Sequence, residues 1–244
     1  MRFALVNAHK TDPQPKLHGH CPHCGEEVLS KCGRVKIWHW AHKSRKVCDP
    51  WWENETEWHR AWKDNFPKEW QEISAVDLET GETHIADVKT SYGLIVEFQH
   101  SAMPSEEMAA RERFYGNMIW IVDGLRGDLD LDYFRIGLGS APIQTNPLAY
   151  AFDWYGNSRI MQNWSDAKAR VFIDFGDSLT KGPPVVWRLV LFDKQKKRGA
   201  VGPYPKHLLI EAILRGEEIG VTHLPTPEEN AAMPEFRAKI NDRH

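Results

Sequence analysis

The chain has 244 residues and a formal net charge of −3, from 31 lysine and arginine against 34 aspartate and glutamate side chains. This length allows one hydrophobic core, or one core with a small satellite domain. No apolar run approaches the roughly 20 residues of a membrane-spanning helix, and the start turns polar too soon for a signal peptide, so we expect a cytoplasmic protein without membrane contact. A negative net charge leaves only local patches or metal ions to attract nucleic acid.

Four cysteines, Cys21, Cys24, Cys32 and Cys48, follow a first short apolar strand and lie in the first fifth of the chain. In a cytoplasmic protein such clustering favours a metal site over disulfides, although four free thiols are the alternative. Cys21 and Cys24 form a C-x₂-C knuckle, and the next residues predict a small β-hairpin with strands at 28–30 and 34–38. A knuckle with a second ligand pair across a hairpin makes a tetrahedral structural zinc site.

The second ligand pair must come from His39, His42 and Cys48. On an extended strand His39 and His42 point to opposite faces, because the side-chain period is two, and they share one ion only if the chain turns between them. His42 with Cys48 avoids that requirement and is our preferred pair. The expected zinc ligands are therefore Cys21, Cys24, His42 and Cys48, and the metal supplies the folding energy of this short module.

The next segment predicts a helix from about Glu53 to Asn65, which Pro67 ends. Glu55, His59 and Lys63 follow one another at intervals of four residues and would lie along one helical stripe. Strands are predicted at about 71–78, 84–89 and 93–99, then a helix capped by Ser105 that runs to 114 or 115, and a central strand over 117–123. This order indicates a mixed sheet with helices on its faces.

Two carboxylates belong to the predicted hairpin: Asp87 follows a polar turn region, and Glu97 lies on the apolar strand that ends with Gln99. A buried carboxylate is unfavourable unless it is paired or binds a metal. Two acids brought together by a hairpin form an oxygen-rich site suited to Mg²⁺, whereas two surface carboxylates are the alternative. The D…(E)x(K/Q) spacing resembles that of the PD-(D/E)XK nucleases.

Further motifs occur in a fixed order along the chain, and together they resemble the competence protein CoiA family of nuclease-like proteins. They are Cys21-x₂-Cys24, His39-Trp40-Ala41-His42, Cys48, Glu55-Thr56-x₂-His59-x₃-Lys63, Ala86-Asp87-Val88, Glu97-Phe98-Gln99-x-Ser101, Arg111-x₃-Tyr115 and Ile119-Trp120-Ile121-Val122. The resemblance implies an α/β, restriction-endonuclease-like fold with a zinc-binding N-terminal module and a role in handling DNA. One departure is His84, where the family often carries arginine.

Carried over to this chain, the resemblance assigns the chemistry to a few side chains. Asp87 and Glu97 would bind Mg²⁺ or Mn²⁺, and Glu55 would join them directly or through water. Gln99 stands where lysine is usual and would orient the attacking water, while Lys63 or Lys89 would supply the missing positive charge. His59 would relay a proton or bind phosphate. Arg111 would clamp a phosphate, or alternatively form a structural pair with Glu97 or Glu112.

We therefore expect three regions: the zinc module at 1–50, a nuclease-like core at 51–123 and a C-terminal extension at 124–244. In the extension, residues 124–150 read as a linker, strands are predicted at 171–175 and 185–192, a helix at 206–215, and a frayed end after Pro225. The expected function is a Mg²⁺- or Mn²⁺-dependent deoxyribonuclease. The alternative, which Gln99 and the acidic net charge favour, is a non-catalytic DNA-binding scaffold, whereas the three retained carboxylates favour the enzyme.

Overall fold

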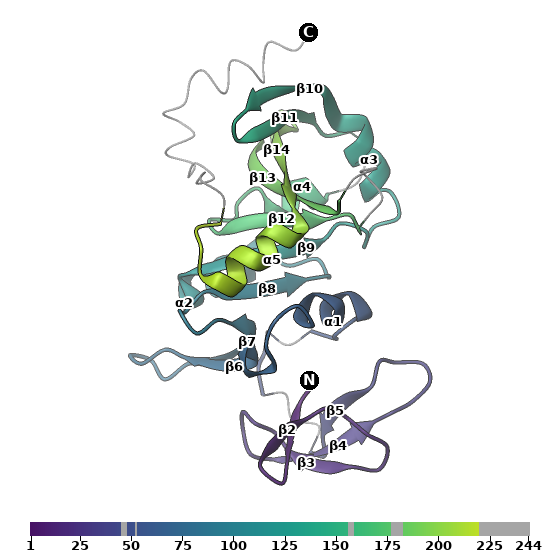
Figure 1. Cartoon of the computed structure of the whole chain (residues 1–244), viewed down its shortest axis with the longest axis vertical. Helices are drawn as coiled ribbons and strands as arrows, with labels where there is room; N and C mark the ends of the chain where they lie inside the picture. Colours follow the sequence, from purple (N-terminus) through teal and green to yellow (C-terminus); the bar gives the residue numbers. More distant parts are fainter. Residues whose placement is uncertain (45–47, 52, 156–158, 177–182, 220–244) are drawn as a thin grey trace. The chain divides into compact units, whose positions relative to one another are not determined.

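The computed structural model of the chain describes residues 1–44, 48–51, 53–155, 159–176 and 183–219. The chain divides into two compact units, Met1–Val96 and Glu97–His244, so that the division falls within strand β8 (Ile95–Gln99). Both units combine strands with helices, as the predicted α/β class requires (Figure 1). The restriction-endonuclease-like topology stays a prediction.

The first unit begins with an antiparallel sheet in the strand order β2-β1-β3-β4-β5. Its strands are β1 (Ala4–Val6), β2 (His9–Thr11), β3 (His18–His20), β4 (Glu27–Lys31) and β5 (His39–His42). Its core is small and consists of Ala4, Cys21, Val28 and Trp40. So small a core buries little apolar surface, which agrees with the expectation that a metal stabilises this module.

The predicted hairpin exists, but its second strand begins later than expected. β4 and β5 pair from Lys31↔His39 to Val28↔His42, so residues 32–38 form a loop and not a strand. Val35 of this stretch is 97% exposed, whereas Ile37 is partly buried. The strand predicted at 34–38 was therefore wrong: the exposed Val35 gains no burial there, and the pairing with β4 ends at Lys31↔His39.

The remainder of the first unit holds helix α1 (Glu57–Lys63), the short 3₁₀ helix η1 (Lys68–Trp70) and strands β6 (Gln71–Val76) and β7 (Thr83–Lys89). β7 pairs antiparallel with β6 on one edge and with the start of β8 on the other. α1 begins four residues later than predicted because Thr56 forms a capping box with His59. Glu55 therefore precedes the helix, and the predicted stripe retains only His59 and Lys63.

Among the residues that the structure describes, the second unit contains the rest of β8, six further strands and four helices. The strand order is β10-β11-β14-β13-β12-β9, in which β9 and β12 are parallel and the other neighbours antiparallel. The elements are α2 (Ser105–Tyr115), β9 (Met118–Asp123), α3 (Asp130–Gly137), β10 (Leu138–Thr145), β11 (Leu148–Asp153), α4 (Ile160–Trp164), β12 (Arg170–Asp174), β13 (Val185–Asp193), β14 (Arg198–Pro205) and α5 (Lys206–Arg215).

Several predictions for this unit hold and others fail. The β9 strand and the α5 helix lie where the apolar patterns placed them, but α2 has Pro104 and not Ser105 at its N-cap position. The linker predicted at 124–150 is wrong, since α3, β10 and the first half of β11 occupy it. Phe134 of that segment is fully buried against Phe152, Phe175 and Trp187. The frayed end predicted after Pro225 lies outside the described residues.

None of the helices in the described part of the chain is both long and apolar enough to cross a membrane.

Candidate metal centre and buried carboxylate cluster

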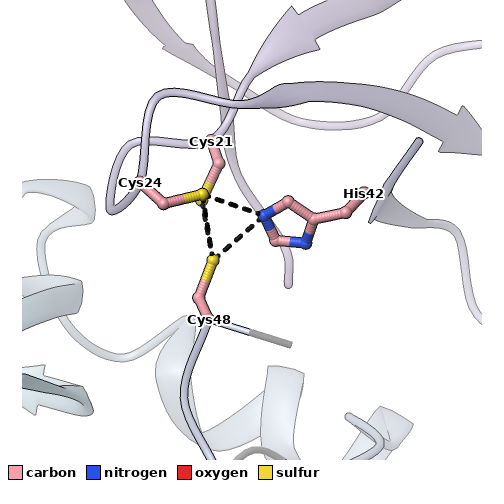
Figure 2. Close-up of side chains that lie close together, drawn as sticks. All are labelled: Cys21, Cys24, His42 and Cys48. Atoms are coloured by element: carbon pink, nitrogen blue, oxygen red, sulfur yellow. Dashed lines mark hydrogen bonds between the residues drawn. The ribbon is translucent and has the colours of Figure 1, made fainter. Parts of the chain in front are cut away.

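Four side chains converge at one end of the N-terminal sheet: Cys21, Cys24, His42 and Cys48 (Figure 2). Their ligand atoms all lie within 4.8 Å of one another. The Sγ atom of Cys48 lies 3.6 Å from that of Cys21 and 3.2 Å from that of Cys24. The Nε2 atom of His42 lies 3.3 Å from the Cys24 Sγ and 3.0 Å from the Cys48 Sγ.

These distances agree with a tetrahedral zinc site. Zn–S bonds of about 2.3 Å and a Zn–N bond of about 2.0–2.1 Å place neighbouring ligand atoms roughly 3.5–3.8 Å apart, slightly more than observed here. Three sulfurs and one imidazole nitrogen are also the donor set that zinc prefers in structural sites. The four residues are those chosen from the sequence, and they can bind a metal such as zinc.

Local geometry explains the choice of ligands. Cys21 and Cys24 come from a tight turn in which Gly25 has a φ of 73° and donates its N–H to the Cys21 carbonyl. His42 is the last residue of β5, whereas His39 at the other end of the strand has its Nδ1 atom 2.9 Å from the Ile37 carbonyl oxygen. The strand thus separates the two histidines, as the two-residue period predicted.

Without a cation the cluster favours the thiol form of Cys21 and Cys48, whereas at Cys24 burial is outweighed by hydrogen bonds from the Glu26 backbone and from Cys48 and Cys21, which lower the pKa of Cys24. Burial raises the pKa of Cys21, and burial together with the neighbouring Cys24 and Cys21 raises the pKa of Cys48. A bound Zn²⁺ would reverse this preference, because only thiolates bind the metal tightly. A closed set of four protein ligands leaves no position for a water, so the site suits a structural role.

A second cluster lies in the same unit, around the buried ammonium group of Lys63 at the end of α1. Its Nζ atom lies 2.9 Å from Asp87 Oδ1, 3.2 Å from Glu55 Oε1 and 3.6 Å from Glu72 Oε1. The Lys63 side chain is only 4% exposed. Burial alone would lower the pKa of Lys63, but Asp87, Glu55 and Glu72 raise it, so the lysine stays charged.

Glu55 reaches this cluster from the segment before α1. Its Oε2 atom accepts a hydrogen bond of 2.9 Å from Arg60 Nε. Its Oε1 atom is buried and has no hydrogen bond among the described residues, although Lys63 is within ion-pair distance. A buried carboxylate oxygen in this state is unusual, since buried polar atoms normally have a hydrogen-bond partner.

Glu72 is a member that the sequence reasoning missed. It lies on β6 with a φ of 47°, a conformation that residues other than glycine rarely adopt, and accepts the backbone N–H groups of Arg2 (2.8 Å) and Phe3 (3.2 Å). Burial alone would raise the pKa of Glu72, but Lys63 and these hydrogen bonds lower it to about 2. Glu72 belongs to no sequence motif. Its position beside the apolar Ile73 in a predicted strand was the only feature of the sequence that could have indicated a buried acid.

His59 lies on α1 one turn before Lys63 and is buried. Its Nδ1 atom accepts the Thr56 N–H at 3.2 Å, so the neutral ring carries its proton on Nε2. Burial lowers the pKa of His59, and the nearby Asp87 only partly offsets this effect. The neutral form is therefore favoured.

The other predicted site residues belong to the second unit. Glu97 on β8 is buried, and its Oε2 atom lies 3.2 Å from Arg111 Nη1. Arg111 also pairs with Glu107 at 2.5 Å and is itself buried, so the structural pair with Glu97, one of the two roles expected for it, is present. Gln99 donates from Nε2 to the Ser101 carbonyl at 3.1 Å.

In a comparison with protein families, residues 14–50 match the family model described as competence protein CoiA, N-terminal domain. This N-terminal segment is therefore similar to the N-terminal domain of CoiA proteins. No curated protein and no solved structure matches the chain.

The CoiA match contains all four residues of the Cys₃His cluster and ends before Glu55. The cluster therefore falls within the part of the chain that the family model describes. The carboxylate cluster falls outside it, so the assignment of Glu55, Asp87 and Glu97 to a PD-(D/E)XK nuclease stays a prediction.

His84, the departure from the CoiA-like pattern, has a clear structural environment. Its Nδ1 atom lies 2.8 Å from Asp49 Oδ1, and its Nε2 atom lies 2.7 Å from Glu82 Oε1. Its ring stacks on that of Trp51, with the two ring centroids 3.2 Å apart. Asp49 directly follows the ligand Cys48 and also accepts the Ile85 N–H. His84 thus ties the segment after the metal cluster to β7, and carboxylates occupy the positions where a phosphate contact would lie.

Proposed function

We propose that this CoiA-like protein is a metal-dependent nuclease that hydrolyses phosphodiester bonds, with DNA as its substrate. The observation that carries the proposal is the arrangement around Lys63, in which Glu55, Glu72 and Asp87 converge on one buried ammonium group. Clusters of carboxylates with a lysine are suited to binding a hard divalent cation and a phosphate together.

The residues of the cluster fit Mg²⁺ or Mn²⁺. Three carboxylates surround the Lys63 ammonium group, and Glu55 also pairs with Arg60. Among the described residues, Glu55 Oε1 is buried with an ion pair to Lys63 but no hydrogen bond, and a metal ligand is one role that satisfies such an atom. Glu55 and Asp87 would hold the ion, and the sequence motif adds Glu97. When bound, such an ion lowers the pKa of a water and neutralises charge on the phosphate.

The protein's own side chains would do the rest of the chemistry. Lys63 keeps a positive charge 2.9 Å from Asp87, which supports its assignment as the substitute for the lysine that Gln99 replaces. Gln99 can position a water only through hydrogen bonds, because its amide carries no charge. His59 is held neutral by burial, and because its Nδ1 atom accepts the Thr56 N–H, its Nε2–H group would bind a phosphate oxygen as a hydrogen-bond donor.

A non-catalytic DNA-binding scaffold is the second candidate. Two observations favour it: Lys63 already pairs with the carboxylates that would hold the metal, and the Gln99 amide donates to Ser101. In such a protein the cluster would be a buried ion-pair network whose role is structural.

The deciding experiment incubates the purified protein with linear duplex, circular and single-stranded DNA in Mn²⁺, Mg²⁺ or EDTA. Cleavage that needs the divalent ion and is lost in Asp87→Asn supports the nuclease. Glu79→Gln is the matched control, because Glu79 is an exposed acid in the turn before β7. Equal cleavage by wild type and Asp87→Asn would exclude this site, and binding without any cleavage would favour the scaffold.

A further inference from the structure

The loop between β4 and β5, residues 32–38, carries several side chains that no part of the proposed chemistry uses. It extends beyond the paired ends of the two strands (Figure 1). Arg34, Val35 and Lys36 are exposed, and Trp38 is 43% exposed despite its large apolar ring. In the part of the chain that the structure describes, neither Arg34 nor Lys36 forms an ion pair.

The loop lies in a strongly basic part of an acidic protein. Residues 28–48 contain no aspartate or glutamate, whereas the whole chain carries a net charge of −3. The basic residues of this stretch are Lys31, Arg34, Lys36, Lys43, Arg45 and Lys46. Such a local excess of positive charge attracts a polyanion even when the net charge of the protein does not.

A groove of about 350 Å³ separates this loop from the start of α1. Val35, Lys36, Ile37 and His39 line one wall, and residues 54–57, including Glu55, line the other. The volume is at the lower end of the range of about 300–1,000 Å³ for ligand sites. The loop side of the groove is thus basic and apolar, and the other side carries two carboxylates, Glu57 and the proposed metal ligand Glu55.

The two walls are connected through Arg60 of α1. Its guanidinium group donates from Nη2 to the Trp38 carbonyl and from Nε to Glu55 Oε2. Within the loop, Trp38 Nε1 donates to the Gly33 carbonyl at 3.1 Å. The position of the loop is therefore linked by direct hydrogen bonds to the carboxylate that borders the groove.

We infer that the β4–β5 loop and this groove bind single-stranded DNA, so that the bound strand lies next to Glu55. This inference rests on the proposed function. Arg34 and Lys36 contact phosphates, while Trp38 and the apolar groove wall contact bases. Single-strand binding surfaces combine these two elements, because cations follow the backbone and aromatic rings stack on unpaired bases. A duplex keeps its bases stacked inside, so an exposed indole and an apolar groove gain much less from it.

Binding is measured by fluorescence anisotropy with a labelled oligothymidylate, its RNA counterpart and a duplex of equal length. Magnesium and manganese are left out, so that cleavage does not contribute and the protein keeps its zinc. Trp38→Ala should weaken binding to the single-stranded DNA by about fivefold or more, because one stacked base is lost. Trp38→Phe should retain most of the affinity, which distinguishes stacking from damage to the loop. Tyr92→Ala is the matched control, since Tyr92 is equally exposed in the β7–β8 turn.

The salt dependence tests the phosphate contacts. Each contact with a single strand contributes about 0.7 to the slope of log K against log[salt], so Arg34→Ala with Lys36→Ala should lower the slope by roughly 1.4. Unchanged binding by Trp38→Ala, an unchanged slope, or tighter binding of the duplex would overturn the inference. Equal affinity for the RNA would leave the surface in place but remove DNA as its ligand. If Trp38-dependent binding occurs and the divalent-ion assay shows no cleavage, the nuclease proposal fails while the binding surface stands.

Discussion

Lys63 Nζ lies 2.9 Å from Asp87 Oδ1 inside the first unit, and Glu55 and Glu72 approach the same ammonium group from two other segments. Sequence motifs pointed to Asp87, Glu55 and Lys63 separately, but their convergence on a buried lysine is a property of the fold. An ion pair this deeply buried is stable only if each charge remains compensated, so removing the lysine should have large effects.

Lys63→Met should destabilise the protein by about 3–5 kcal/mol, because three carboxylates lose their shared cation. Methionine keeps most of the side-chain length, which limits the loss of packing. If these carboxylates are able to bind a divalent ion, Mn²⁺ should raise the melting temperature of the variant more than that of the wild type. Urea unfolding followed by circular dichroism, with and without Mn²⁺, measures both effects.

The control for this prediction is Lys68→Met. Lys68 Nζ also lies 2.9 Å from a carboxylate, Asp12, but the Lys68 side chain is 57% exposed. Exposed pairs contribute about 0–1 kcal/mol, so this variant should be close to wild type. If Lys63→Met is equally mild, the carboxylates around Lys63 do not depend on it for charge compensation.

The Cys₃His cluster predicts about one zinc per chain in the purified protein. Cys24→Ser should lose the metal and destabilise the N-terminal sheet, whose small core cannot fold well without it. Cys32→Ser is the matched control, because Cys32 is a free cysteine outside the cluster. Metal analysis together with thermal unfolding gives the result, and a folded, zinc-free Cys24→Ser protein would show that the metal is dispensable.

The two-residue period of a strand argued against His39 and His42 as a ligand pair and so favoured one histidine with Cys48, and the structure places His42 in the cluster. The position of Glu55 could not be derived in the same way. The i, i+4 spacing suggested a helix through Glu55, but Thr56 caps α1 and Glu55 reaches Lys63 from outside the helix. Glu72 joins the cluster through tertiary contacts with Arg2 and Phe3, which no local pattern records.

The second unit shows a similar limit. β14 was not predicted, because its sequence Arg198–Pro205 is rich in glycine and proline, which are rare in strands. β10 is largely exposed and lies next to β11 alone, so it has no apolar face to mark it in the sequence. The buried strand β9, in contrast, is apolar from Met118 to Val122 and was found from its near-continuous apolar run.

Glu72 should make stability depend on acid pH. Its pKa is lowered from 4.5 in the unfolded chain to about 2, so the stabilisation is complete above about pH 4.5 and is lost as the pH falls toward 2. The full effect is on the order of 3 kcal/mol. Glu72→Gln should therefore be less stable than wild type at pH 7, and the difference should shrink as the solution is acidified to pH 3.

Urea unfolding of both proteins between pH 7 and pH 3 gives this difference, and release of zinc at low pH affects the two proteins alike. Glu79→Gln serves as the control, because Glu79 is exposed in the turn before β7. A difference between wild type and Glu72→Gln that stays constant with pH would mean that Glu72 does not titrate differently in the folded and unfolded states.

The last prediction separates the enzyme from the scaffold through Gln99, whose Nε2 atom donates to the Ser101 carbonyl and lies 3.3 Å from Ser101 Oγ. If Gln99 orients the attacking water, Gln99→Ala should lower the cleavage rate by roughly 10²-fold, about 3 kcal/mol, because the water loses its position in the transition state. Gln99→Lys should keep at least part of the activity, since lysine also reaches a water and adds charge.

Affinity for DNA should hardly change in either variant, because one neutral amide contributes little beside phosphate contacts. Ser101→Ala is informative as well. It removes the hydroxyl near the Gln99 amide but leaves the Ser101 carbonyl, which accepts the hydrogen bond from Gln99. Its effect on the cleavage rate should therefore be much smaller than that of Gln99→Ala. Cleavage and binding are measured on the same preparations in Mn²⁺. A scaffold would bind DNA equally well in all four proteins and cut in none. Equal cleavage by wild type and Gln99→Ala would remove Gln99 from the mechanism and leave only the carboxylates and Lys63 as its catalytic groups.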